Sequence, residues 1–134
     1  MIRTADRMPA PLRAALARTF GQSVDDVEIV EHSRYARLHW GARATTRRNR
    51  ILLRGSAEEF FADSDLLLHE YYHVLRQWNR GRLSLWRYLL EWSRRGYWES
   101  RYERHARRFV RLRRQVLRRH LGASQLSGGG TPPP

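Results

Sequence analysis

Two histidines four residues apart constrain this chain more than any other feature of its sequence. Residues 69–73 are His-Glu-Tyr-Tyr-His, and three leucines precede them while Val74 and Leu75 follow. On an α-helix, positions i and i+4 lie one turn apart on the same face, so both imidazoles can reach one ion. Because the flanking residues are apolar, we expect a largely buried helix, in which two unpaired imidazoles would be costly. The segment therefore predicts a buried helix that carries a metal site.

The residue types predict zinc and hydrolytic chemistry. His69 and His73 would supply two ligands of a tetrahedral site at about 2.0–2.1 Å per Zn–N bond. Glu70 follows the first histidine, where it can hold and deprotonate a metal-bound water instead of binding the ion. Bound Zn²⁺ lowers the pKa of that water toward about 7, which produces a hydroxide able to attack a carbonyl carbon. The alternative is a partly polar helix face on which Glu70 forms a surface salt bridge.

A catalytic zinc ion also needs a third protein ligand and one open position. Glu99 and Glu103 stand four residues apart, so on a helix they share one face. Glu103 borders an apolar stripe, but an ion pair with Arg107 explains this residue about equally well. His105 lies about 200° around the helix from Glu103 and should not bind the same ion. The remaining candidates are His32, His39, Glu91 and His120.

The first half of the chain predicts one short helix and a small sheet. Residues 1–8 are polar and are expected to fray. Pro9–Phe20 has helical spacing of its apolar residues, and Gly21 is a typical helix stop. Apolar and polar residues alternate in the expected strands, which lie around residues 27–29, near residue 38, and on both sides of a polar turn at residues 47–50.

The second half predicts three longer helices, at residues 64–78, 83–94 and 98–121. Asp63 or Ser64 can cap the first of them. From Gly122 the sequence is rich in glycine, serine and proline, so residues 122–134 are expected to form a disordered tail. We therefore expect one α+β domain over residues 1–121, with a small sheet, about four helices and a mostly helical C-terminal half.

Composition excludes several classes of chemistry. The 134 residues fit one domain, and the absence of cysteine excludes disulfides and thiolate metal sites. All 26 basic residues are arginine, which excludes lysine Schiff-base chemistry and a P-loop lysine. No run approaches the roughly 20 apolar residues of a transmembrane segment, and the first residues lack the apolar run of a signal peptide. The cytoplasm is therefore the default location.

Positive charge is concentrated in the expected last helix. The chain has a net charge of +13, and nine arginines lie between residues 101 and 121, where Glu103 is the only acidic residue. Six of these arginines fall opposite the apolar stripe: Arg104, Arg107, Arg108, Arg111, Arg114 and Arg118. Such a face predicts contact with nucleic acid or an anionic lipid surface. The alternative is a solvated face that keeps a small protein soluble.

The segment from Asp65 to Val74 resembles the "LLxHExxHVxQ" segment of a bacterial metallopeptidase-type domain, the core domain of extracellular contractile injection system proteins. The helix and short strands expected before residue 54 follow the order found in that family. Downstream, Tyr102-Glu103-Arg104-His105-Ala106 resembles its "Y-E-x-E-A" segment. The resemblance covers about residues 9–110. The chain departs from the family in three places: Gln77 stands four residues after His73, His105 replaces the second Glu, and Ser100-Arg101 replaces Asn-Pro.

This resemblance implies a minimal zincin-like peptidase of the gluzincin type, with one zinc ion bound by two histidines and a glutamate. Glu103 would be the third ligand, with Glu99 as the next candidate. The substrate would be a peptide or protein that pairs with a strand edge beside the helix that carries His69 and His73, called the motif helix below. We place that edge at Arg50, Ile51, Leu52 and Leu53. Candidates for stabilising the oxyanion are Tyr97, Arg101, Tyr102 and His105.

The resembled family includes proteins exported by non-classical machinery, so export is an alternative to the cytoplasm. Two further functions compete with catalysis. One is a binding module whose zinc is structural and has a fourth protein ligand such as His32 or His39. The other is an arginine-rich nucleic-acid-binding protein in which the two-histidine motif has no metal.

Overall fold

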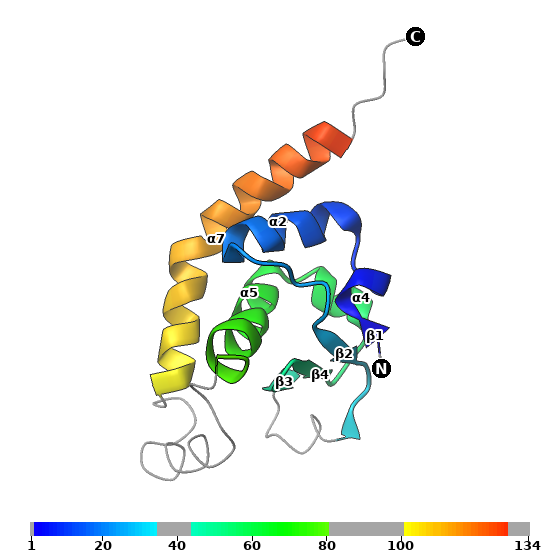
Figure 1. Cartoon of the computed structure of the whole chain (residues 1–134), viewed down its shortest axis with the longest axis vertical. Coiled ribbons are helices and arrows are strands. Elements are labelled where there is room, and N and C mark those ends of the chain that lie inside the picture. Colours follow the sequence, from blue (N-terminus) through cyan, green and yellow to red (C-terminus); the bar gives the residue numbers. More distant parts are fainter. Residues whose placement is uncertain (1, 35–43, 81–100, 129–134) are drawn as a thin grey trace.

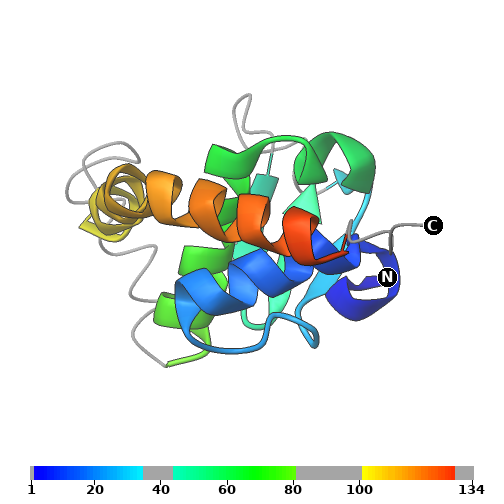
Figure 2. The same cartoon turned by 90° about the horizontal axis from the view of Figure 1, so that it is seen from above.

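The computed structural model describes residues 2–34, 44–80 and 101–128. Within them, a small mixed sheet lies against helix α5 (Ser64–Tyr72), and the long helix α7 (Arg101–Gly128) packs on α5 (Figure 1). Helix α2 (Ala10–Phe20) runs beside α7, as seen from above in Figure 2. The arrangement confirms the predicted α+β fold class.

Four strands form the sheet in the order β1-β2-β4-β3. They are β1 (Ile2–Arg3), β2 (Glu28–Val30), β3 (Ala44–Arg47) and β4 (Arg50–Leu53). Strands β3 and β4 form the predicted hairpin, in which Asn49 takes the positive φ of 56° that its turn requires. Strand β4 also pairs in parallel with β2 on its other side. The prediction that residues 50–53 form a strand edge is therefore wrong, because both sides of β4 are hydrogen-bonded.

Residues 2–8 are ordered, contrary to the expectation that residues 1–8 fray. Strand β1 pairs with β2, and the short helix α1 (Thr4–Arg7) follows it. The Thr4 hydroxyl is buried, donates to the Val27 carbonyl at 2.8 Å and lies 2.6 Å from the Tyr71 hydroxyl. These contacts with residues distant in the sequence order residues 2–8, although the composition of this segment is polar.

The helices before the motif begin and end at recognisable caps. Helix α2 ends at Phe20, and the predicted stop, Gly21, is its C-cap with a φ of 69°. Helix α4 (Ala57–Phe61) was not predicted because five residues are too few for a periodic pattern; its N-cap is Ser56, whose hydroxyl accepts from the Glu59 N–H. Asp63 caps α5 by accepting from the Leu66 N–H at 3.1 Å.

The motif helix changes its geometry within the motif. It is an α-helix as far as Tyr72, and His73–Trp78 (η1) continues it as a π-helix that closes with Asn79 N–H donating to the Val74 carbonyl at 2.8 Å. The sequence predicted one continuous helix to Trp78, and this is confirmed apart from the wider turn. Such π-helical turns are rare and are often found at functional sites.

Helix α7 extends past Leu121 to Gly128, beyond the predicted end at residue 121. Gly122 lowers helix propensity by about 1 kcal/mol relative to alanine but does not terminate a helix, and the following Ala, Ser, Gln and Leu are compatible with one. The predicted helix at residues 83–94 and the predicted start at Trp98 lie outside the described residues. No helix in the described part of the chain combines the length and the apolar character that a bilayer crossing needs.

One core joins the sheet to the helices. Its fully buried side chains come from every layer: Leu16 of α2, Ile29 of β2, Ile51 of β4, Leu67 and Tyr71 of α5, and Leu117 of α7. Phe20 and Phe109 stack with ring centroids 4.9 Å apart where α2 meets α7. This packing fixes the position of the motif helix between the sheet and α7.

Candidate metal centre

Three side chains from two helices converge at one point in the interior. The Nε2 atom of His69 lies 2.9 Å from one carboxylate oxygen of Glu103, and the Nε2 atom of His73 lies 3.1 Å from the other. The two Nε2 atoms are 3.2 Å apart. His73 and Glu103 are each 4% exposed, and His69 is partly exposed. The cluster is thus buried on the side of Glu103 and accessible beside His69.

Each ligand is placed by its helix. The two histidines stand one turn apart at the end of α5 and the start of η1, as their i, i+4 spacing requires. Glu103 lies in the first described turn of α7, between Tyr102 and the buried Ala106, whose small side chain allows α7 to approach α5. Close packing of the two helices brings the carboxylate to the imidazoles.

The cluster shifts the pKa values of its members strongly. Burial by itself lowers the pKa of His73, but the Glu103 carboxylate, through charge and a hydrogen bond, raises that pKa to about 9. Burial raises the pKa of Glu103, whereas the charge of His73 and hydrogen bonds from both histidines hold it well below the usual value. Without a metal, therefore, His73 is a cation and Glu103 an anion at neutral pH.

Glu70 lies close to this centre. Its side chain is buried, and its charge is one of the causes that raise the pKa of His73. Glu70 immediately follows His69 on α5, so it lies beside the helix face that carries the two histidines but not on that face itself.

The donor set suits zinc. Two imidazole nitrogens and a carboxylate oxygen are the ligands of many catalytic zinc sites, and all three candidate ligand atoms lie within 4.8 Å of one another. In a tetrahedral site with bonds of 2.0–2.1 Å the ligand atoms are about 3.3–3.4 Å apart, so small shifts from the present distances would accommodate the ion. Across the described ranges no other such cluster of acidic, histidine or cysteine side chains is found.

Sequence reasoning overlooked Gln77. Its side chain is buried and lies 2.6 Å from the Nδ1 atom of His73, while its amide nitrogen donates to the Tyr102 carbonyl at 3.1 Å. The signal was present in the sequence, because Gln77 stands four residues after His73 and hence on the same side of the helix.

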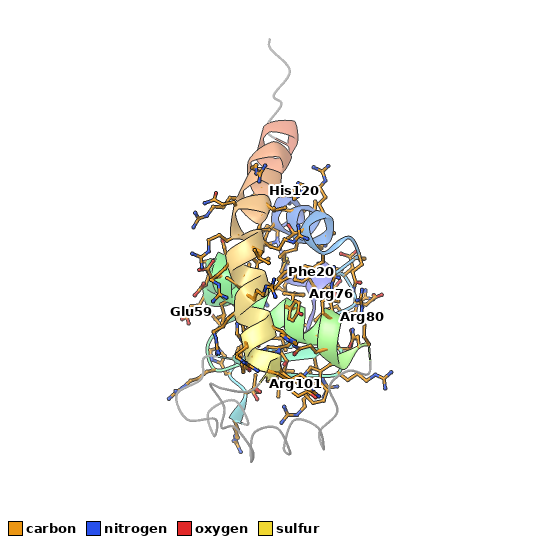
Figure 3. The ribbon with its side chains drawn as sticks, turned by 90° about the vertical axis from the view of Figure 1, so that its left-hand side faces the viewer. Phe20, Glu59, Arg76, Arg80, Arg101 and His120 are labelled. Carbon is orange, nitrogen blue, oxygen red and sulfur yellow. The ribbon has the colours of Figure 1, made fainter. Side chains whose placement is uncertain are left out.

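The other predicted residues have varied positions. Tyr102 is buried with Trp78, and the Arg101 guanidinium lies 5.2 Å from its ring centre. His105 and His32 are exposed, and neither belongs to the cluster. His120 lies toward the far end of α7, opposite Arg101 (Figure 3). The last set, His39, Glu91, Tyr97 and Glu99, lies outside the described residues.

Helix α7 presents arginines on its outer side. Seven of them are exposed in the described structure: Arg101, Arg104, Arg108, Arg111, Arg113, Arg118 and Arg119. Arg114 pairs with Asp65 of α5 at 3.0 Å. Leu112, at 63% exposure, is the one large apolar side chain exposed among the described residues. Of the six arginines predicted to form the basic face, Arg104, Arg108, Arg111 and Arg118 are exposed, whereas Arg107 and Arg114 are half-buried.

The fold and the cluster together define a small α+β domain with a candidate metal centre between its motif helix and its last helix. The chain belongs to the eCIS core domain family, that is, the core domain of extracellular contractile injection systems: residues 7–81, more than half of the chain, match that family. The match includes His69, Glu70, His73 and Gln77 but ends before Glu103. Neither curated proteins nor solved structures give a significant match.

Proposed function

We propose that this protein is a zinc-dependent peptidase that hydrolyses peptide bonds in a peptide or protein substrate. The observation that supports it most is the convergence of His69, His73 and Glu103 beside the buried Glu70. Three protein ligands would leave a tetrahedral zinc ion one position for solvent or substrate, which is the arrangement of catalytic zinc sites. The eCIS core family points to a role connected with a protein assembly.

Bound zinc would lower the pKa of a water molecule and polarise the substrate carbonyl. In this mechanism Glu70 accepts the proton of the attacking water as general base and later delivers it to the leaving amine. His69, His73 and Glu103 hold the reaction centre at a fixed place between α5 and α7. Burial of Glu103 and His73 removes competing water from that side and strengthens the charge interactions within the site.

Strand β3 is a better candidate than β4 for receiving an extended substrate. In the described sheet β3 pairs only with β4, and the Trp78 indole N–H ties it to the motif helix by donating to the Thr46 hydroxyl at 3.1 Å. The Thr46 carbonyl accepts from the Arg47 guanidinium at 2.7 Å, as expected of a carbonyl directed away from β4. A substrate strand would replace this contact with main-chain hydrogen bonds.

The proposal is tested by replacing Glu70 with Gln and measuring zinc content and peptide hydrolysis of the purified protein. The variant should keep one zinc per chain and lose turnover by about 100-fold or more, since general base catalysis contributes about 10²–10⁴. Glu59→Gln, an exposed glutamate on α4, is the matched control and should behave like the wild type. Equal hydrolysis by Glu70→Gln and wild type would refute the role of Glu70. Bound zinc without turnover in the wild type would favour the zinc-stabilised binding module.

A second candidate function is contact with nucleic acid through the outer side of α7. Nine of the 26 arginines occur within residues 101–121. A bias toward arginine codons would replace lysine throughout the chain but would not concentrate positive charge in one helix. Several arginines stand three or four residues apart, where like charges destabilise a helix, and a bound polyanion would relieve that repulsion. This function is compatible with a peptidase site, because the arginines and the cluster occupy different sides of α7.

A further inference from the structure

Gln77 connects the second histidine of the cluster with the backbone next to its carboxylate. The amide oxygen lies 2.6 Å from His73 Nδ1, and the amide nitrogen donates to the Tyr102 carbonyl at 3.1 Å. Tyr102 immediately precedes Glu103, so one side chain of η1 reaches both helices that supply ligand atoms. Gln77 is 3% exposed, and water therefore does not compete for these bonds.

The direction of these hydrogen bonds follows from the donor and acceptor types. The Tyr102 carbonyl can only accept, so the NH₂ group of Gln77 must face it. The amide oxygen then faces His73, and because an amide oxygen can only accept, Nδ1 of His73 must carry a proton. In a neutral imidazole this leaves Nε2 unprotonated, with its lone pair directed toward His69 and Glu103.

We propose that Gln77 is a positioning residue of the metal centre, which selects the His73 tautomer with a free Nε2 and fixes α7 so that Glu103 reaches the same ion. Hydrogen bonds to the second nitrogen of a metal-binding histidine orient the ring and increase its basicity. The π-helical turn that begins at His73 belongs to this arrangement, because it contains both the imidazole and the amide that holds it. The inference rests on the zinc site of the proposed function.

Zinc affinity separates this role from simple packing. Gln77→Met keeps the approximate shape but removes both hydrogen bonds, and it should weaken zinc binding by about 10- to 100-fold. Gln77→Glu keeps an acceptor for Nδ1 but loses the donor to Tyr102, so its loss should be smaller than that of Gln77→Met. Gln115→Met, at an exposed glutamine of α7, is the control and should leave the affinity unchanged. Competition with a chromophoric zinc chelator at constant pH measures all four proteins.

The outcomes distinguish the two proposals. Absence of zinc binding by the wild type would refute the proposed function itself. Equal affinities of the wild type and a folded Gln77→Met variant would refute the inference about Gln77 and leave the zinc site standing.

A second measurement needs no variant and covers the case in which Gln77→Met fails to fold. In ¹⁵N-labelled, zinc-loaded wild type, long-range ¹H–¹⁵N spectra should show His73 with a slowly exchanging proton on Nδ1 and the metal on Nε2. Metal binding through Nδ1, or a proton on Nδ1 that exchanges as fast as that of the exposed His105, would overturn the inference.

Discussion

The imidazole of His73 and the carboxylate of Glu103 form a buried ion pair, with Nε2 and Oε1 3.1 Å apart, between the π-helical turn of the motif helix and the start of α7. Each side chain is 5% exposed. In the absence of metal, the Nε2 atom of His73 carries a proton toward Glu103, and a zinc ion would bind at that same nitrogen. Proton and zinc therefore compete for the same nitrogen.

This competition predicts that zinc binding releases a proton. Because the pKa of His73 is raised to about 9, the metal-free protein carries this proton at pH 7 and must lose it when Nε2 binds zinc. Deprotonation of His73 should raise the apparent zinc affinity about tenfold per pH unit up to pH 9. Above pH 9 this contribution should level off, because the imidazole is already neutral. Calorimetric titration at pH 7 in two buffers of different ionisation enthalpy should give close to one proton released. Zero protons released at pH 7 would contradict the raised pKa.

Replacing Glu103 with Gln should abolish tight zinc binding. The amide keeps the size of the carboxylate but removes the negative charge that holds both imidazoles, so we expect at least about a 100-fold loss of affinity, larger than for an outer residue such as Gln77. Equilibrium dialysis followed by elemental analysis measures this loss. Glu58→Gln, on an exposed glutamate that pairs with Arg7, should retain wild-type affinity. A Glu103→Gln protein that retains full affinity would exclude Glu103 as the third ligand.

The contact between Thr4 and Tyr71 should stabilise the fold without affecting the metal. The Thr4 hydroxyl bonds to the Val27 carbonyl and to the Tyr71 hydroxyl, and burial raises the pKa of Tyr71. Tyr71→Phe should lower the free energy of unfolding by about 1 kcal/mol, and Thr4→Val by about 1–3 kcal/mol because it leaves the buried Tyr71 hydroxyl without this partner, while the Val27 carbonyl still accepts from the backbone N–H of residue 4. Urea denaturation of both variants and of the double variant measures these losses. The double variant should lose less than the sum of the single losses, since one bond is shared; strict additivity would contradict the contact.

The arginines of α7 should determine the salt dependence of nucleic-acid binding. Replacing Arg108, Arg111 and Arg118 together with Gln should weaken binding of duplex DNA and reduce the slope of log affinity against log salt by about 2–3, close to 0.9 per lost phosphate contact. Fluorescence anisotropy over a range of salt concentrations measures both quantities.

The matched control for this prediction removes the same charge elsewhere. Arg18, Arg48 and Arg54 are exposed outside α7, and their joint replacement with Gln should leave the salt slope nearly unchanged. If both triple variants lose affinity equally, binding depends on net charge and not on α7. Preference for anionic vesicles over DNA at equal salt would assign the same arginines to a lipid surface.

The sequence by itself determined the features that depend on neighbouring residues. The spacing of His69 and His73 places both imidazoles on one helix face wherever that helix packs. Asp63 can cap the next turn because its carboxylate and the Leu66 N–H are only three residues apart. The turn at Asn49 and the stop at Gly21 follow in the same way from backbone preferences of single residues.

Only the tertiary structure decided the features that join distant segments. Glu103 could equally have paired with Arg107, and its contact with the histidines exists because α7 packs on α5. Strand β4 lies inside the sheet because β2, which is distant in the sequence, pairs with it. The alternation of apolar and polar residues within β4 cannot predict that pairing. Thr4 is ordered by Val27 and Tyr71 for the same reason. Local preferences specify helices and turns, whereas the free energy that selects partners comes from burying surfaces that meet only after the chain has folded.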